Sequence, residues 1–234
     1  MIDLSGKLIR PWVHCDWLSV NARATQRVLV IRAHPVRESL LQAAGDRAVA
    51  ALKQSGHEIR EFDLYADDFD PRLSVDEWRT RHSPNMTRPE LADHIDALRW
   101  ANHLVLVYPT WFGGFPAILK GWLDRVWVQG VAYELAPGAR RPQSLLRHLR
   151  VVTVLTTHGS SKLMNIVQGE PGRRMLRRGI RSQASLRCQT RWVALYGNDQ
   201  IDASARQRFL ERVDHEFALV HRERTDVLRH RRSR

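Results

Sequence analysis

The segment 103–109, HLVLVYP, restricts the fold of this chain more than any other stretch. It is a nearly continuous apolar run, which is typical of a strand that is covered on both of its faces. Strands of this kind occur in parallel sheets, whose helices pack on either side. The segments around it should therefore supply those helices and further strands.

Strand and helix patterns alternate along the rest of the chain. Four more strand-like runs occupy residues 27–34, 57–65, 150–159 and 189–197. Helical spacing of apolar residues is found in 39–56, 89–102, 116–127 and 202–217, and a basic helical region lies at 173–181. Strands that are separated by helices need crossover connections. The sequence therefore predicts an α/β fold, a doubly wound, flavodoxin-like five-stranded parallel sheet with helices on both faces.

The strand and helix patterns fill the middle of the chain and leave both ends outside. A chain of 234 residues, of which 43% are hydrophobic, can bury one sizeable core. Residues 1–26 show no steady period, so we expect them to form an N-terminal extension. Residues 27–222 form the predicted flavodoxin-like domain, and 223–234 are a basic C-terminal tail.

The net positive charge favours anionic ligands or partners but does not identify which kind. Lys and Arg number 37 against 25 Asp and Glu, which gives a net charge of +12. Phosphorylated cofactors, nucleic acid and acidic lipid headgroups all fit this charge. The arginines gather at 173–181 and 222–234. These two clusters either bind an anionic partner or are only a solvated helix face and a solvated tail. Because no basic recognition motif with interleaved aromatic residues is present, we expect no binding to nucleic acid.

The cysteine and histidine patterns support neither a disulfide framework nor a metal site. Cys15 and Cys188 are far apart and form no CxxC motif, and the 11 His residues show no metal-ligand spacing. The first residues lack the pattern of a signal peptide, and no stretch approaches the ~18 apolar residues of a membrane span. We therefore expect a cytoplasmic protein without a metal.

Three loops follow strands and should meet at the carboxyl edge of the sheet, where doubly wound proteins bind ligands. They are AHPVRES, YPTWFGGFP and TTHGSS. The first loop lacks the G-x-G-x-x-G pattern of a dinucleotide site. It places Ser39 at a helix start, where the hydroxyl caps the helix or helps to hold a phosphate with His34 and Arg37.

The second of these loops combines large aromatic residues with glycines. Trp111 and Phe112 precede Gly113 and Gly114, and the glycines permit a positive φ and a close backbone approach to a ligand. The two aromatic side chains either form an apolar wall for a flat ring or fold back onto the core. The helix that follows has one apolar face and contains Gly121, which allows close packing of a crossing segment.

The motifs HPVRES, YPTWFGGFPAILKGWLDRVW and TTHGSS, in this order and spacing, resemble the flavodoxin-like NAD(P)H:quinone oxidoreductases. This family also includes bacterial flavoproteins that regulate potassium efflux systems. The resemblance covers residues 27–220, and the middle motif is its most specific part. It implies a flavin-binding domain with a bound FAD, or alternatively FMN. It also implies NAD(P)H as co-substrate and a quinone-like acceptor that follows it in a ping-pong cycle.

The resemblance further implies which residues bind the cofactor. By position they are His34, Ser39 and Leu40 at the phosphates, Pro109, Thr110, Trp111, Phe112 and Gly113 at the ring, and Thr156, Thr157 and Gly159 in the fourth-strand loop. The helix 116–127 lies near a subunit interface in the family, so a homodimer is expected. The alternative function is that of a regulatory flavoprotein on a potassium or other cation efflux antiporter, which implies peripheral association with a membrane transporter.

Two departures from the family pattern concern the site. Leu40 and Leu41 stand where many relatives have an aromatic residue and Asn, and His158 stands where the fourth-strand loop usually has Gly. An imidazole at this place, beside the ring, can donate a hydrogen bond or a proton near neutral pH, so His158 is the candidate catalytic residue. The alternative is that His158 only fills space. Arg173 and Arg177 are candidates for binding the 2′-phosphate of NADPH.

Overall fold

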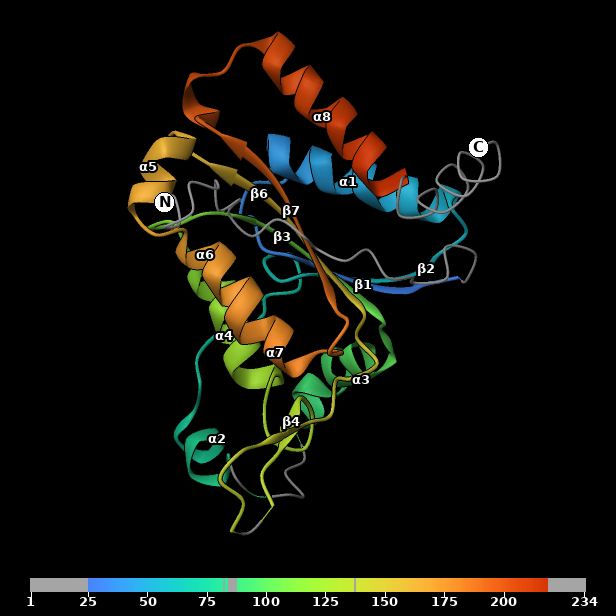
Figure 1. The fold of residues 1–234 in the computed structure, drawn as a ribbon, viewed down its shortest axis with the longest axis vertical. Helices are drawn as coiled ribbons and strands as arrows, with labels where there is room; N and C mark the ends of the chain where they lie inside the picture. Colours follow the sequence, from blue (N-terminus) through green and yellow to red (C-terminus); the bar gives the residue numbers. More distant parts are fainter. Residues whose placement is uncertain (1–24, 82, 84–87, 137, 219–234) are drawn as a thin grey trace, which may run out of the picture.

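The computed structural model describes residues 25–81, 83, 88–136 and 138–218 and contains a five-stranded parallel sheet (Figure 1). The strand order is β2-β1-β3-β6-β7. Its strands are β1 (Arg27–Arg32), β2 (Glu58–Asp63), β3 (His103–Pro109), β6 (Val151–His158) and β7 (Gln189–Tyr196). All neighbouring pairs in it are parallel. The doubly wound fold expected from the sequence is confirmed, with all five strands in the predicted places.

Helices cover both faces of this sheet, as Figure 1 shows. One face carries α1 (Leu40–Gln54) and α8 (Ala203–Ala218). The other carries η1 (Pro89–Leu91), α3 (Ala92–Trp100), α4 (Ala117–Val126) and a continuous helical run made of α6 (Pro171–Arg174), η2 (Met175–Ile180) and α7 (Arg181–Gln183). Two short helices, α5 (Lys162–Val167) and η3 (Asn198–Gln200), lie beyond the strand ends. The basic helical region predicted at 173–181 is thus confirmed.

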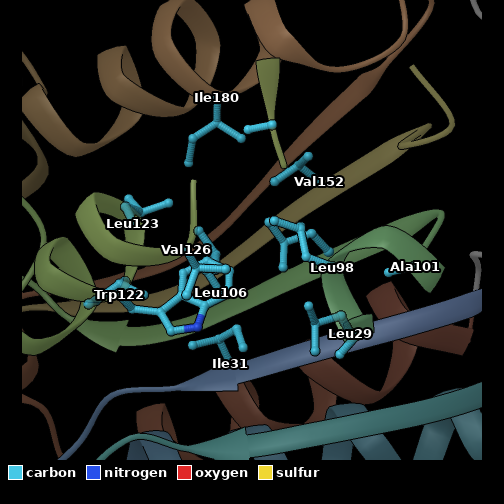
Figure 2. Packing of buried hydrophobic residues seen from close by; sticks show 14 of the residues in the cluster. Leu29, Ile31, Leu98, Ala101, Leu106, Trp122, Leu123, Val126, Val152 and Ile180 are labelled. Carbon is cyan, nitrogen blue, oxygen red and sulfur yellow. The ribbon is translucent and has the colours of Figure 1, made fainter. Parts of the chain in front are cut away.

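The core forms because side chains alternate between the two faces of each strand. In β3, Leu104 and Leu106 pack toward α3 and α4, whereas Val105 and Val107 pack toward α1 and α8. Figure 2 shows the first of these clusters, with Trp122 and Val126 of α4 against Leu106. β3 is therefore buried on both faces, which explains its unbroken apolar run.

Two excursions from the sheet were not expected from the sequence. Helix α2 (Val75–Thr80) lies between the strand predicted at 57–65 and the helix predicted at 89–102, and Ser74 and Glu77 close its start with a capping box. A small hairpin of β4 (Tyr133–Glu134) and β5 (Gln143–Ser144) lies in a loop rich in Pro and Gly. The buried carboxylate of Glu77 accepts from Nε of Arg125 in α4 at 2.8 Å, which attaches α2 to the domain.

The chain ends lie largely outside the described residues, whereas Cys188 lies inside the domain. The extension and the basic tail, with Cys15, lie outside the described residues apart from 25 and 26, so the domain limits remain predictions. Cys188 is buried as a free thiol, and burial raises its pKa to about 11. Within the described part of the chain, no helix is both long enough and apolar enough to cross a bilayer.

A buried histidine in β3 makes stability depend on pH. The ring of His103 is fully buried between Gln26 Oε1 and Thr153 Oγ1, each 2.9 Å from a ring nitrogen. Burial lowers the pKa of His103 from 6.5 to about 3, so the unfolded chain takes up the proton first as the pH falls. The stability that the neutral ring contributes is complete above pH 6.5 and is lost toward pH 3.

Acidification should therefore reveal this group in urea unfolding. Between pH 7.5 and pH 5 we expect His103 to remove about 2 kcal/mol from the free energy of unfolding, at about 1.4 kcal/mol per pKa unit. His103→Gln retains an amide for both hydrogen bonds but cannot titrate. It should lose about 2 kcal/mol less than the unmodified protein over the same interval. Equal losses in both proteins would contradict the assignment.

Candidate functional site

Three loops at the carboxyl edge of the sheet follow neighbouring strands, as the sequence predicted. The loops begin after β1, β3 and β6, which are adjacent in the sheet. The backbone N–H of Thr110 donates to the carbonyl of Thr157 at 2.9 Å, which joins the second and third loops directly. The register places Tyr108 beside Thr156 and Pro109 beside Thr157. The predicted ring-binding and fourth-strand residues thus meet in one place.

The loop after β3 is a tight turn that displays two aromatic side chains. Trp111 and Gly114 exchange backbone hydrogen bonds of 3.2 and 2.9 Å, while Phe112 and Gly113 between them have φ values of 48° and 70°. A turn with two positive φ values explains the need for glycine beside Phe112. Trp111 is 61% exposed and Phe112 is fully exposed. The alternative that both side chains fold back onto the core is therefore wrong.

The start of α6 supports this turn from behind. The N–H of Gly172 donates to the carbonyl of Gly113 at 3.2 Å. A Cβ at Gly113 would lie 3.2 Å from Pro171 Cγ and 3.3 Å from Gln168 Oε1. The turn is therefore packed against the α5–α6 connection, residues 168–170, and against the first residues of α6, and together they form one side of the site.

The loop after β6 is shaped by residues that the sequence analysis did not single out. A Cβ at Gly159 would lie 2.7 Å from a carboxylate oxygen of Asp199, so a larger residue there requires the Asp199 side chain to turn aside. The buried amide of Asn165 donates to Ser160 Oγ and to the carbonyl of Ser161, both at 2.9 Å. A polar residue inside the apolar segment KLMNIV was the available signal for Asn165.

His158, the candidate catalytic residue, ends β6 and is 3% exposed. Its Nδ1 lies 3.3 Å from Thr110 Oγ1, and its ring stacks on Tyr196 with centroids 4.5 Å apart. Its buried Nε2 has no hydrogen-bond partner in the described part of the chain. Burial lowers the pKa of His158, so the ring is neutral at neutral pH. The geometry favours a neutral hydrogen-bonding group, and its catalytic role remains a prediction.

Two further buried hydroxyls lie on the same side of the sheet as His158. Thr156 Oγ1 and the Tyr108 hydroxyl have no partners among the described residues. Tyr108 was not among the predicted site residues, although it ends the apolar run of β3. A Cβ at Gly172 would lie 3.3 Å from the Tyr108 hydroxyl, so α6 covers this oxygen. Polar atoms thus collect beneath the loops after β3 and β6.

The loop after β1 leads into a helix start. Ser39 caps α1, and its hydroxyl accepts from the N–H of Gln42 at 3.2 Å. This confirms the capping role, which was one of the two roles that the sequence suggested for Ser39. His34 Nδ1 accepts from the N–H of Val36 at 3.0 Å, and burial lowers the pKa of His34. Leu40 begins the helix, whose first turn contains no acidic residue. The positive end of α1 favours an anion, and the carboxylate of Asp63 already lies beside it, 3.0 Å from Nε2 of Gln42 and 3.7 Å from Nη1 of Arg37.

The comparisons with known proteins agree with this fold. Residues 26–215 match the model of a family described as having a flavodoxin-like fold. The rat NAD(P)H dehydrogenase [quinone] 1 is 30% identical over 165 residues, which cover 64% of this chain and 59% of that protein. The FMN-dependent NADH:quinone oxidoreductase of Staphylococcus haemolyticus is 28% identical over 165 residues, which cover 64% of this chain and 78% of that protein.

A solved structure shows the same architecture. The NAD(P)H:quinone oxidoreductase from Methanothermobacter marburgensis superposes with a TM-score of 0.73 at 24% identity, covering 86% of this chain and all of that one. At this identity the likeness shows the fold alone. The chain spans 59% of the length of the rat relative, so the activity of that whole protein does not transfer to this chain without further argument.

Proposed function

The chain belongs to the flavodoxin-like fold family, and on this premise we propose that it is a flavin-dependent oxidoreductase that uses NAD(P)H to reduce a quinone or a similar acceptor. The observation that carries the proposal is the turn 111–114, which holds two exposed aromatic side chains over the carboxyl edge of the sheet. An exposed pair of this kind costs solubility unless a flat apolar partner covers it. The names of the relatives support the same activity.

The residues present fit a flavin. The backbone N–H groups of Phe112 and Gly113 have no hydrogen-bond partners in the described part of the chain, so they are available to polar ring atoms. Thr156 Oγ1 and His158 Nε2 are buried polar atoms without partners among the described residues at the same edge. The start of α1, with Ser39 as its cap, suits a phosphate group. The site thus offers hydrogen-bonding groups for the flavin ring and a helix start for its phosphate.

When bound, the flavin supplies the chemistry by accepting a hydride from NAD(P)H and passing electrons to the acceptor. The chain's own residues would bind the flavin and orient its ring. Trp111 and Phe112 form an apolar wall that excludes water, and Pro109, Thr110 and Gly113 set the backbone of the turn. Thr157 and Gly159 place the backbone of the neighbouring loop. His158 holds Thr110 through the contact at 3.3 Å.

We favour FMN over FAD as the cofactor. FAD was the first expectation from the sequence resemblance, but the S. haemolyticus relative is named as FMN-dependent. We also propose a ping-pong cycle, in which NAD(P)H leaves the site before the quinone or similar acceptor occupies the same place. The relatives above are named as dehydrogenases and oxidoreductases, and those names give no support to a regulatory role on a cation efflux antiporter, so we do not propose that role.

The proposal is tested by releasing the cofactor from purified protein and identifying it by mass. NAD(P)H oxidation is then followed with and without a benzoquinone, and parallel lines in double-reciprocal plots would support the ping-pong cycle. We expect close to one FMN per chain and turnover that requires the quinone. A folded protein that takes up neither FMN nor FAD would refute the proposal.

A homodimer is also proposed, but through a surface other than the expected one. Trp122 of α4 is fully buried within the single chain, so it is not available to a subunit interface. Helix α5 instead buries only Asn165 and exposes its apolar residues, which are Leu163, Met164, Ile166 and Val167. These four side chains form an apolar surface on α5 that a second copy would cover. Sedimentation equilibrium of the flavin-bound protein tests this proposal.

A further inference from the structure

An uncompensated basic stripe begins beside the site. Residues 171–187 contain no acidic residue and six arginines, Arg173, Arg174, Arg177, Arg178, Arg181 and Arg187. The run α6–η2–α7 buries Gly172, Leu176 and Ile180, so its arginines lie on the other sides of the helix. Like charges three and four residues apart repel one another and destabilise a helix. An anionic ligand would relieve this repulsion.

The carboxylate of Glu170, next to the start of α6, already pairs with an arginine. Both oxygens of Glu170 accept from Nη1 of Arg173, at 3.1 and 3.2 Å. Arg174 is exposed, and its side chain has no hydrogen bond or ion pair with any other described residue. Its Nη1 lies 3.3 Å from the place that a Cβ at Gly169 would take. The guanidinium of Arg174 therefore lies over the α5–α6 connection with its donors available.

The α5–α6 connection is part of the site. Gln168 and Pro171 lie against Gly113 of the aromatic turn, and Gly172 donates to the carbonyl of Gly113. Arg174 consequently lies over residues that pack against the aromatic turn, at the edge of the proposed site. The sequence favoured Arg173 and Arg177 for this role. The pairing with Glu170 neutralises Arg173 and leaves Arg174 as the free guanidinium closest to the turn along the chain.

We propose that Arg174 binds the 2′-phosphate of NADPH and makes this protein prefer NADPH to NADH. A guanidinium presents paired N–H donors that match phosphate oxygens, and such charge-assisted hydrogen bonds are strong. The 2′-phosphate is the only group by which the two coenzymes differ, so a residue that binds it changes their ratio. This inference rests on the proposed function, because it assumes that a nicotinamide coenzyme enters the site.

The experiment compares kcat/KM for the two coenzymes in matched variants. Arg174→Gln should lower kcat/KM for NADPH by about tenfold and leave the value for NADH within about twofold, as expected for a hydrogen bond to a charged group. Arg187→Gln removes the same charge four residues after the end of α7, and its coenzyme ratio should equal that of the unmodified protein. Arg174→Lys should retain part of the preference.

A binding measurement without redox chemistry separates this proposal from the proposed function. Calorimetry compares 2′,5′-ADP with 5′-AMP, which differ only in the 2′-phosphate. The unmodified protein and Arg187→Gln should bind 2′,5′-ADP more tightly, and Arg174→Gln should lose that difference. Equal loss of both coenzymes in Arg174→Gln, or no preference in the unmodified protein, would overturn the inference. Absence of any NAD(P)H oxidation would instead refute the proposed function.

Discussion

Replacing Gly121 with alanine should lower the free energy of unfolding by about 3 kcal/mol, the upper part of the usual range for overpacking a core. A Cβ at this position would overlap the carbonyl oxygen of Pro71 and lie 2.5 Å from its Cα. These are backbone atoms, so the loop after β2 must move away from α4 as a unit. The neighbouring Trp122 is fully buried and would move with the helix.

The matched control for Gly121 is Gly179→Ala in η2. There the new methyl group would meet Met175 Sδ at 2.7 Å, the far part of a flexible side chain that can turn aside. Alanine also favours helix by about 1 kcal/mol over glycine, so this variant should be neutral or more stable. Urea unfolding of both variants measures the difference. A Gly121→Ala protein as stable as the Gly179→Ala protein would show that the Pro71 segment yields freely.

Replacing His158 with alanine should leave the flavin bound but slow one half-reaction by roughly 10- to 100-fold, less than the full effect of a positioned acid–base group. The side chain lies at the junction of the two loops that we assign to the ring, where its Nδ1 contacts Thr110. Its loss removes one of the two contacts of the Thr110 hydroxyl, which still donates to the carbonyl of Thr157 at 3.1 Å, and opens the space beside Tyr196. Stopped-flow measurement of NAD(P)H oxidation and of quinone reduction, taken separately, identifies the affected step.

The pH dependence distinguishes a neutral from a charged role for His158. Burial lowers the pKa of this ring, so it stays neutral above its ordinary value of 6.5, and the rates should not change between pH 7 and pH 8 because of it. His158→Gln, which keeps an amide near Thr110, should recover part of the lost rate. Flavin affinity, measured by fluorescence titration, should change little in either variant. Unchanged rates for His158→Ala from pH 6 to pH 8 would leave His158 as packing.

Sequence patterns were sufficient for the sheet and for the turn at its edge. The apolar run of β3 requires cover on both faces, and the structure provides it. Ser39 caps α1, and Lys120 and Asp124 form the i,i+4 ion pair that their spacing predicts. Gly113 takes the positive φ that its place in the loop required. Each of these features depends on residues that are close in the sequence, so local chemistry decides it.

Features that depend on distant segments were not accessible from the sequence. The apolar face of α4 does not reveal whether the core or a second copy covers Trp122, and only the packed sheet places it inside. The segment KLMNIV gives no sign that α5 turns its amide inward and its apolar residues outward. The sequence does not distinguish the adjacent residues Arg173 and Arg174, and only the folded chain shows that Glu170 pairs with Arg173. Periodicity specifies which side chains share a face, but burial and pairing depend on which remote segment covers that face, and this is decided only when the whole chain packs.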